Sequence, residues 1–315
     1  MNTISKDSVS YLEVGEEDAG QRLDNYLLRH LKGVPKSHVY RIIRSGEVRV
    51  NKGRTDAMYR VNTGDLVRLP PIRIAESAPT EKPVPTNELP IVYEDEALLV
   101  INKPAGIAVH GGSGVSFGVI EQMRAARPQA KFLELVHRLD RETSGLLLIA
   151  KKRSALVAMH DAMRGTGIDK RYLAMVPGAF PEKTQHLKFK LFKYNTEDGE
   201  RRVRVSADGQ EAHTIVRRQQ CWSSSSLVEA ELKTGRTHQI RVHLAHCGFP
   251  IMGDEKYGDF GLNRQLARQG LKRMFLHAWR LRFKHPLSDQ PLVLEAPLPP
   301  ELQRYLERLT KEDAQ

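Results

Sequence analysis

Cysteine is scarce in this chain of 315 residues. Only Cys221 and Cys247 are present, far apart in the sequence, so no disulfide framework is expected. No stretch approaches the roughly 18 consecutive apolar residues that a membrane span needs. No basic flank precedes an apolar segment at the N-terminus, as it would in a secretory signal. These absences predict a cytoplasmic protein without membrane segments, and the apolar fraction of 40% is ordinary for a globular chain.

Motifs for common cofactors are also missing. The chain has neither the G-x-x-x-x-G-K-[ST] phosphate loop nor the G-x-G-x-x-G fingerprint, so nucleotide cofactors are not indicated. Residues 114–118 read GVSFG, which matches the nucleophile elbow of serine hydrolases in form, but the preceding HGGS is not the strand that the elbow requires. The glycines of HGGSG fit a plain loop as well as a turn that lets a phosphate approach closely.

Histidine is more abundant, with 12 residues, so a metal site has to be considered. His243, His246 and Cys247 could offer ligands, and His238 lies nearby in the sequence. No second pair at zinc spacing accompanies them. We therefore expect no metal and no cofactor.

Positive charge is concentrated near the N-terminus. The net charge is +11, and residues 22–73 hold 12 Lys and Arg against 4 Asp and Glu. A compact basic segment attracts a polyanion by releasing condensed counterions, so this distribution favours nucleic acid as the partner. The alternative is a solvated surface that happens to be basic.

Proline marks a division in the chain. Residues 70–90 contain six of the 17 prolines and little apolar pattern, which is typical of an extended, semi-rigid linker. We predict a small domain over residues 20–73, a linker over residues 74–90 and a large domain over residues 91–315.

The small domain is expected to contain two short helices followed by a small sheet. Apolar residues recur at helical spacing in GQRLDNYLLRHL and in HVYRIIRSG, for which Ser37 is the candidate N-cap, and EVRVNKGR and VNTGDLVRLP alternate like strands. With RLDNYL, KSHVYRIIRSGEVRVN and GDLVRL, this segment resembles the S4 RNA-binding domain. The resemblance implies a small α/β unit that binds RNA through basic residues on its second helix and turn: Lys36, Arg41, Arg44 and Lys52.

The large domain is predicted to be a mixed α+β domain with a largely antiparallel sheet and flanking helices. Strand-like segments outnumber helical ones and often follow each other directly, which argues against a doubly wound parallel sheet. The helical segments are FGVIEQMRAAR, SALVAMHDAMRG and the C-terminal PPELQRYLERLTK.

The segment at residues 135–151, LVHRLDRETSGLLLIAK, combines charge with burial. GLLLIA is apolar at every position, which predicts a buried strand, and the charged loop before it is therefore held at both ends. The loop is either a structural cluster of ion pairs or a catalytic site. Asp140 and Glu142 could hold a divalent metal, but the flanking Arg138 and Arg141 already supply the positive charge that such ligands would seek.

A second polar segment is KTGRTHQIRVHLAH, at residues 233–246. If QIRVHL is a strand, Gln239, Arg241 and His243 share one face and need a polar partner or a site. Asp140 is a natural partner for Arg241, and the pair would keep the carboxylate ionised. Tyr172, at the start of the apolar KRYLAMVPG, is either a core residue or a platform that stacks on a base.

Together these segments resemble the pseudouridine synthases of the family typified by bacterial large-subunit rRNA enzymes. The matching segments span roughly residues 90–285 and are NKPAGIAVHGG, HRLDRETSGLLLIAKK, KRYLAMVPG, TGRTHQIRVHL, GFPIMGDEKYG and FLHAWRLRF. The resemblance implies that uridine is isomerised without a cofactor: the N1 glycosidic bond breaks, the base rotates, and C5 bonds to C1′.

The resemblance also implies roles for individual residues. Asp140 matches the essential carboxylate, which either attacks the nucleotide or assists formation of a glycal-like intermediate, and Arg241 is its basic partner. Tyr172 matches the tyrosine that stacks on the target base and helps to remove the C5 proton. Leu276, in FLHA, matches an apolar residue beside the catalytic pocket, and Arg138 matches the arginine that replaces the flipped base in the helix.

The expected function is site-specific isomerisation of uridine in large-subunit rRNA, free or in an assembling particle, by a monomer. Two alternatives remain open: the specificity of a sister subfamily that also carries an S4 domain, and a non-catalytic rRNA-binding assembly factor. A metal-dependent nuclease would need a cage of carboxylates that the sequence does not contain. The charged segment at residues 195–212 is expected to form a hairpin that contacts RNA.

Overall fold

The chain consists of two compact units, residues 1–84 and residues 85–315. The computed structural model describes residues 4–31, 33–72, 84–85, 89–111, 117–165 and 167–314. Most of the linker predicted over residues 74–90, and most of the glycine-rich segment HGGSGVSFG, lie outside the described residues.

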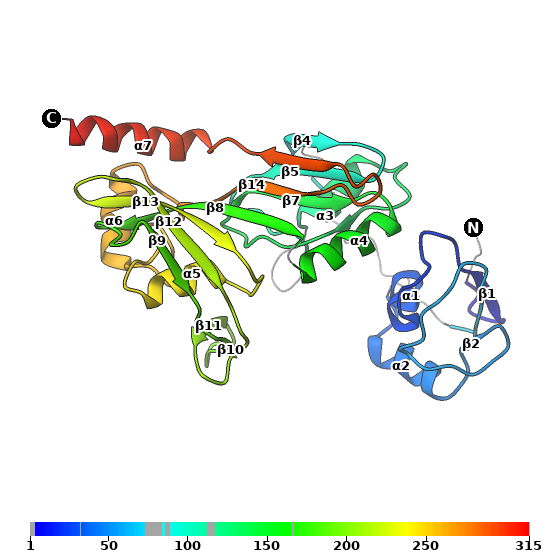
Figure 1. Cartoon of the computed structure of the whole chain (residues 1–315). Coiled ribbons are helices and arrows are strands. Elements are labelled where there is room, and N and C mark those ends of the chain that lie inside the picture. Colours follow the sequence, from blue (N-terminus) through cyan, green and yellow to red (C-terminus); the bar gives the residue numbers. More distant parts are fainter. Residues whose placement is uncertain are drawn as a thin grey trace. The chain divides into compact units, whose positions relative to one another are not determined.

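The first unit is a three-stranded sheet with two helices (Figure 1). Its elements are β1 (Ser10–Glu13), α1 (Leu23–His30), α2 (Lys36–Arg44), β2 (Arg49–Val50) and β3 (Leu66–Leu69). The strand order is β1-β3-β2, and both pairings are antiparallel. The helices and the strand–turn–strand segment were predicted, whereas β1 was not.

The predicted apolar faces of both helices are buried in one core with the sheet. Ser37 is not the N-cap, because α2 already begins at Lys36 and Pro35 precedes it with an extended backbone. Asp24 is buried although the pattern placed it on an outer face. Its carboxylate accepts hydrogen bonds from Arg22 and from the hydroxyl of Tyr40, which compensate for its burial.

The second unit is built on one large sheet. Its elements in chain order are β4 (Ile91–Glu94), β5 (Leu98–Lys103), α3 (Val119–Ala126), β6 (Glu134–Leu135), β7 (Ser144–Ala150), α4 (Arg153–Arg164), β8 (Ile168–Pro177), β9 (Thr184–Leu187), β10 (Leu191–Asn195), β11 (Arg201–Val205), β12 (Thr214–Cys221), β13 (Ser225–Leu232), α5 (Gln239–His246), α6 (Phe260–Arg268), β14 (Leu276–Lys284), β15 (Pro291–Glu295) and α7 (Pro300–Asp313).

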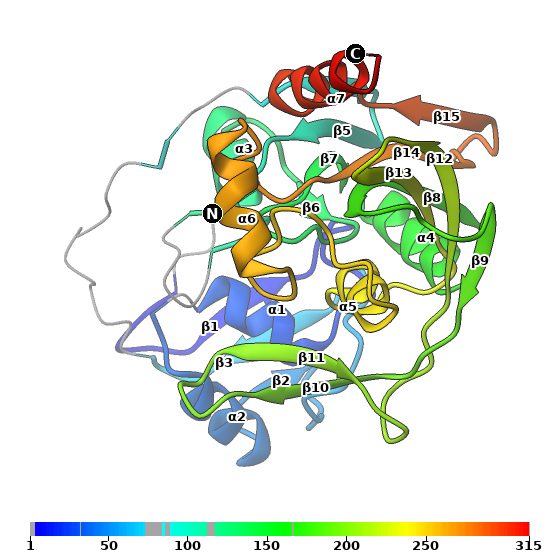
Figure 2. The ribbon, with the colours of Figure 1, turned by 90° about the vertical axis from the view of Figure 1, so that its left-hand side faces the viewer.

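The main path of the sheet runs β4-β5-β7-β14-β8-β13-β12-β9, with β15 paired to β14 and β6 paired to β7. Among the strands that the structure describes, β7 and β14 pair in parallel, and the other pairings are antiparallel. The predicted α+β class with a largely antiparallel sheet is therefore confirmed. β10 and β11 form a separate two-stranded hairpin beside α5 (Figure 2). The charged segment at residues 195–212 supplies the turn and β11 of this hairpin, whereas β10 begins before it at Leu191.

Strand β7 is buried over its whole length, as the apolar run predicted. Leu147 and Ile149 pack into a core that includes α3, whereas Leu146 and Leu148 pack into a core on the other face that includes α4. A strand covered on both faces needs apolar residues at every position. The loop that precedes β7 is therefore attached to one of the most deeply buried elements of the unit.

The segment QIRVHLAH is the helix α5, so the prediction of a strand was wrong. The alternation of polar and apolar residues suggested two faces, but the first six residues of α5 are all buried, polar ones included. Gln239 and His243 use internal partners, since both bind the hydroxyl of Thr214 on β12. A helix enclosed on all sides shows no amphipathic stripe, and the β-branched Ile240 and Val242 add to the strand-like appearance.

Of the residues that the structure describes, none belongs to a helix with the length and apolar character needed to cross a bilayer.

Gly145 lies where the backbones of β7 and β14 approach each other closely. Its φ is +112°, and a Cβ atom there would overlap the backbone of Ala278 on β14. We expect Gly145→Ala to lower the free energy of unfolding by at least about 3 kcal/mol, because two backbones would have to separate. Thermal and urea unfolding measure this effect.

The matched control is Gly178→Ala, whose φ of +71° is also left-handed but whose Cβ would meet nothing within 4 Å. In this variant the free energy of unfolding should fall by only about 1 kcal/mol, the cost of placing an alanine in the left-handed conformation. Equal losses in the two variants would show that close approach of β7 and β14 is not the constraint.

Candidate active site

Four elements of the second unit meet at one cavity of about 760 Å³, which is in the size range of small-molecule sites. The loop before β7 contributes Asp140, β8 contributes Tyr172, the first residue of β14 is Leu276, and α5 contributes Arg241. The structure therefore brings together the predicted catalytic residues, and Arg138 lines the same cavity.

The order of the central strands explains this meeting. β14 lies between β7 and β8 in the sheet, so the loop that leads into β7 and the start of β14 are close in space. Ser144 and His277, for example, are 133 positions apart in the chain and share a hydrogen bond. Tyr172 lies opposite Ala278 of β14 and Ala230 of β13. Small neighbours on both sides leave room for its ring.

Asp140 and Arg241 form the predicted ion pair. The Nη1 of Arg241 donates to the Oδ2 of Asp140 at 3.0 Å. The side chain of Arg241 is only 8% exposed, while that of Asp140 is 26% exposed. The carboxylate is thus held from the protein side and open toward the cavity.

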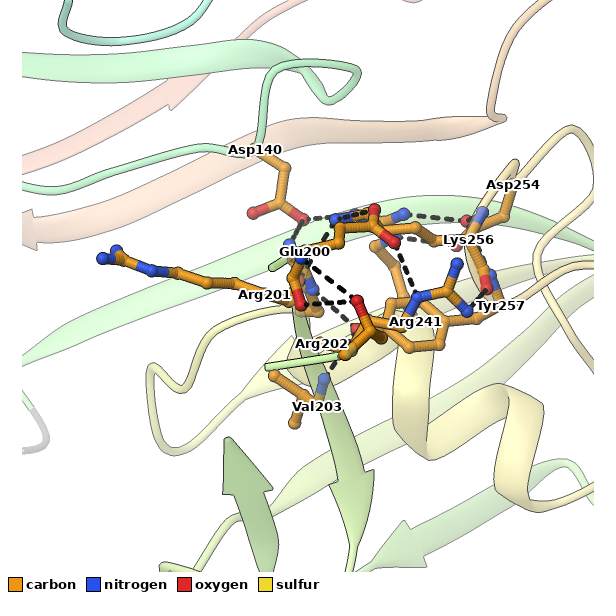
Figure 3. Close-up of polar contacts among 11 residues, drawn as sticks. Asp140, Glu200, Arg201, Arg202, Val203, Arg241, Asp254, Lys256 and Tyr257 are labelled. Carbon is orange, nitrogen blue, oxygen red and sulfur yellow. Dashed lines mark hydrogen bonds and ion pairs between the residues drawn. The ribbon is translucent and has the colours of Figure 1, made fainter. Parts of the chain in front are cut away.

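Arg241 also binds a second carboxylate, which the sequence analysis missed. Its Nε and Nη2 donate to Oδ2 and Oδ1 of Asp254 at 2.7 and 2.8 Å, and Asp254 has no exposed surface. Burial alone would raise the pKa of the Asp254 carboxyl, but hydrogen bonds and charge from Arg241, together with the backbone N–H groups of Lys256 and Tyr257, hold that pKa below its usual value. Figure 3 shows Arg241 between the two carboxylates.

Tyr172 is a buried tyrosine whose ring lines the cavity. Burial raises the pKa of its phenol well above the usual value, and the charge of Asp140 raises it further. The hydroxyl therefore carries its proton at neutral pH.

Two side chains fix the loop that carries Asp140. The ring of His137 accepts a hydrogen bond from the backbone N–H of Leu148 on β7. Burial, and then the charge of Lys170, lower the pKa of His137 to about 4, so the ring is neutral. The buried Nζ of Lys103 donates to the carbonyl oxygens of Pro104, Ile107 and Arg141 at 2.8 to 3.1 Å.

The remaining charges of the loop face outward. Arg138 is exposed, and its side chain has no hydrogen bond or ion pair among the described residues. Arg141 donates to the carbonyl of Gly106 and lies 3.5 Å from Glu142, and both of these charged side chains are largely exposed. The loop is therefore not one cluster of mutual ion pairs, because its central carboxylate pairs with α5.

Comparisons with known proteins support the resemblance to pseudouridine synthases. The model of the RNA pseudouridylate synthase family matches residues 97–246, and the S4 domain model matches residues 21–67. The chain is 49% identical to "Ribosomal large subunit pseudouridine synthase C" of Pasteurella multocida over 98% of this chain and 96% of the relative. It is likewise 49% identical to the protein of that name in Escherichia coli K12, over 96% and 97%. The chain belongs to the RNA pseudouridylate synthase family.

Solved structures agree with this assignment. "Human RNA Pseudouridylate Synthase Domain Containing 4" superposes with a TM-score of 0.59 at 28% identity, over 70% of this synthase and 93% of the human chain. "Human RNA Pseudouridylate Synthase Domain Containing 1", with a TM-score of 0.58 at 24% identity, shares the fold.

The basic residues predicted to bind RNA lie on the first unit of the synthase. Lys36, Arg41 and Arg44 are on α2, and Lys52 follows β2 in the turn. All four are exposed, and the contacts of Arg41 with Glu47 and with the ring of His38 are both long, at 3.5 Å. RNA binding by these four residues stays a prediction.

No group of three or more His, Cys, Asp or Glu side chains with the spacing of a metal site occurs among the residues described for the synthase. His243, considered as a ligand above, binds the hydroxyl of Thr214 with Nδ1 and the carbonyl of Phe189 with Nε2. Both ring nitrogens are thus in use.

Two buried charged residues of the synthase, Asp254 and Lys103, were not predicted from the sequence. Asp254 lies in GDEKYG, which the resemblance covered, but nothing in the spacing indicates that it binds Arg241. Lys103, in the NKP segment, was equally unassigned. A buried lysine or aspartate is recognised only when its partners are known, because burial of an unpaired charge is too costly to expect.

The buried pair of Asp254 and Arg241 makes a testable contribution to stability. We expect Asp254→Asn to lower the free energy of unfolding by about 3 kcal/mol, because it removes half of a bidentate ion pair with no exposed surface on the acid side. The folded pKa of Asp254 lies below the ordinary value of about 4, so this stabilisation is present above that pH and is lost as the pH falls through the folded pKa.

Urea unfolding of the wild type and Asp254→Asn between pH 3 and pH 7 measures both effects. Asp259→Asn is the control, since Asp259 caps α6 through backbone N–H groups and asparagine can cap as well. A difference between wild type and Asp254→Asn that stays constant down to pH 3 would contradict the assignment.

Proposed function

We propose that the chain converts specific uridines of large-subunit ribosomal RNA to pseudouridine. The observation that carries the proposal is the Asp140 carboxylate, paired with Arg241 at 3.0 Å and open to a cavity that Tyr172 and Leu276 line. The full-length similarity to proteins named ribosomal large subunit pseudouridine synthase C supports the substrate and favours that specificity over the sister subfamily.

Asp140 is the proposed catalytic carboxylate. Its Oδ2 is held by Arg241, and its Oδ1 has no hydrogen bond among the described residues, so one oxygen is oriented while the other is available to the nucleotide. Isomerisation breaks the N1–C1′ bond and forms the C5–C1′ bond. Asp140 either attacks the nucleotide or assists the formation of a glycal-like intermediate from it, and both routes use the ionised form.

Tyr172 and Leu276 are the proposed walls for the uracil ring. Stacking on an aromatic face contributes roughly 1–3 kcal/mol per base and tolerates rotation of the base within its plane. The raised pKa of the Tyr172 phenol supports stacking more strongly than removal of the C5 proton by a phenolate. If Tyr172 accepts that proton, its own proton has to leave at the same time.

Arg138 is the proposed replacement for the flipped base. Its side chain is exposed beside the cavity and has no competing partner among the described residues. A planar guanidinium stacks and donates hydrogen bonds in its plane, which suits it to the gap that an extruded base leaves. Removal of a base from a helix costs a few kcal/mol, and Arg138 would offset part of that cost.

The first unit is the proposed anchor on the RNA. Its exposed basic residues would neutralise phosphates and raise affinity without reading sequence. We further propose that the linker at residues 74–90 separates this anchor from the catalytic unit, and that the protein acts as a monomer without a cofactor.

The central test is Asp140→Asn. We expect release of tritium from rRNA labelled with 5-³H-uridine to fall by at least about 10³-fold, because the amide can neither attack nor stabilise positive charge at C1′. Glu142→Gln changes a carboxylate in the same loop whose pairing is exposed, and it should keep wild-type activity.

Mapping of pseudouridine by carbodiimide-dependent stops of reverse transcription, in rRNA treated with each variant, identifies the modified positions. Wild-type protein that releases no tritium would overturn the proposed function. Release that survives Asp140→Asn would overturn only the role of Asp140.

Arg138→Ala separates base flipping from chemistry. We expect turnover to fall about ten-fold on an RNA hairpin with a paired target, and by less than about two-fold on an RNA whose target uridine is already unpaired. Single-turnover assays on the two RNAs measure the ratio. Equal losses on both would show that Arg138 acts in binding or chemistry rather than in filling the gap.

A further inference from the structure

A chain of hydrogen bonds leads from the β10–β11 hairpin to the neighbourhood of Asp140. The backbone N–H of Val203 on β11 donates to the hydroxyl oxygen of Tyr257 at 3.0 Å. That hydroxyl lies 2.8 Å from the Nδ1 of His238, and the Nε2 of His238 lies 3.8 Å from the Oδ2 of Asp140. Figure 3 shows Val203 and Tyr257 next to the carboxylate network.

The direction of these bonds follows from the donors available. The N–H of Val203 can only donate, so it occupies a lone pair of the Tyr257 oxygen. No other acceptor for the Tyr257 hydroxyl proton occurs among the described residues, and an unsatisfied hydroxyl in a half-buried position is costly. Burial raises the pKa of the Tyr257 phenol, so the proton is present to be donated to the Nδ1 of His238.

The charge state of His238 determines how many of its ring nitrogens carry a proton. Burial lowers its pKa, and the charges of Arg241 and Lys256 lower it further, while Asp140 and Asp254 act in the opposite direction. The ring is therefore neutral at neutral pH and has a single N–H. Because Nδ1 accepts from the tyrosine hydroxyl, that N–H is on Nε2.

The backbone supports a fixed position for this ring. His238 has a φ of +53°, a left-handed conformation that only a few per cent of non-glycine residues adopt, although histidine does so more often than most. Strained conformations of this kind cluster at sites where a side chain has to be aimed. His238 immediately precedes α5, the helix that carries Arg241.

We propose that Tyr257 is a positioning residue that holds His238 as the Nε2–H tautomer, so that an N–H rather than a lone pair faces Asp140 beside Arg241. The inference rests on the proposed catalytic role of Asp140. A lone pair directed at the carboxylate would repel it, whereas an N–H stabilises its charge without adding a second cation to the pocket.

The same arrangement makes the hairpin part of the active site. Lys256, next to Tyr257, pairs with Glu200 at 2.8 Å and donates to the carbonyl of Arg201 at 3.2 Å. These contacts hold β11 against the segment that contains Tyr257, and so place the N–H of Val203. The orientation of the His238 ring thus depends on a strand that would otherwise look like a surface insertion.

The tautomer can be measured in the free protein, without RNA. Long-range ¹H–¹⁵N correlation spectra of histidine-labelled protein distinguish a protonated from an unprotonated ring nitrogen, and loss of signals in His238→Asn assigns the residue. We expect His238 to show an unprotonated Nδ1 and a protonated Nε2 at neutral pH. In Tyr257→Phe the Nδ1 loses its hydrogen-bond donor, so its ¹⁵N signal should shift and Nδ1 should take up a proton at a higher pH than in the wild type.

Tyr194→Phe is the matched control. It removes a hydroxyl from the same hairpin that has no hydrogen bond among the described residues, and it should leave the His238 signals unchanged. Tyr257→Phe keeps the aromatic ring, whose centroid lies 5.1 Å from the guanidinium carbon of Arg241, so that contact is preserved. A protonated Nδ1 in the wild type, or unchanged signals in Tyr257→Phe, would overturn the inference.

Activity gives an independent readout. We expect Tyr257→Phe to lower kcat about ten-fold with little change in KM, the size of one lost hydrogen bond. The acidic limb of its pH profile should move to higher pH, because His238 is protonated more easily once Nδ1 no longer accepts a bond. An unchanged kcat and pH profile in an active wild-type background would contradict the inference alone.

Two substitutions of His238 separate its N–H from its backbone. His238→Gln places an amide N–H near the position of Nε2 and should keep several-fold more activity than His238→Asn, although asparagine adopts the left-handed backbone more readily. The opposite order would show that the backbone conformation matters and the N–H does not. The tautomer measurement decides the inference even if the protein makes no pseudouridine.

Discussion

The second unit depends on one buried guanidinium. Arg241 lies between Asp140 and Asp254, and it uses both edges of its planar fork. Removal of such a group from water costs several kcal/mol, which only well-oriented partners offset. Asp254 supplies the bidentate pair that fixes the plane of the guanidinium, and Nη1 is left to orient the catalytic candidate. The fully buried acid thus acts on the partly exposed one through the arginine between them.

The sheet determines where this arrangement can form. Parallel pairing of β7 and β14 requires that two backbones approach at Gly145, where no side chain fits. This contact fixes the end of the charged loop next to the start of β14 and beside β8, so Asp140, Leu276 and Tyr172 enter one cavity. Elements buried on both faces hold these residues, and a loop attached to such elements can be precise without being covered itself.

The sequence predicted partners better than it predicted geometry. The pairing of Asp140 with Arg241 is correct although α5 was taken for a strand, because a buried arginine needs a carboxylate in either structure. Alternation could not reveal the helix, since Gln239 and His243 find partners inside the protein and are buried with their apolar neighbours. Asp254 could not be assigned at all, because its role exists only once the chain has folded back on α5.

The hairpin of β10 and β11 is a second feature whose role could not be predicted from the sequence. Its charges suggested a surface for RNA, yet some of them form ion pairs within the same unit. Glu200 pairs with both Arg202 and Lys256. Those ion pairs place a single backbone N–H, that of Val203, on the oxygen of Tyr257. Composition detects charges but not the direction of a hydrogen bond. The proposed role of His238 therefore depends on an uncharged main-chain group of the hairpin, which is linked to Asp140 through the rings of Tyr257 and His238.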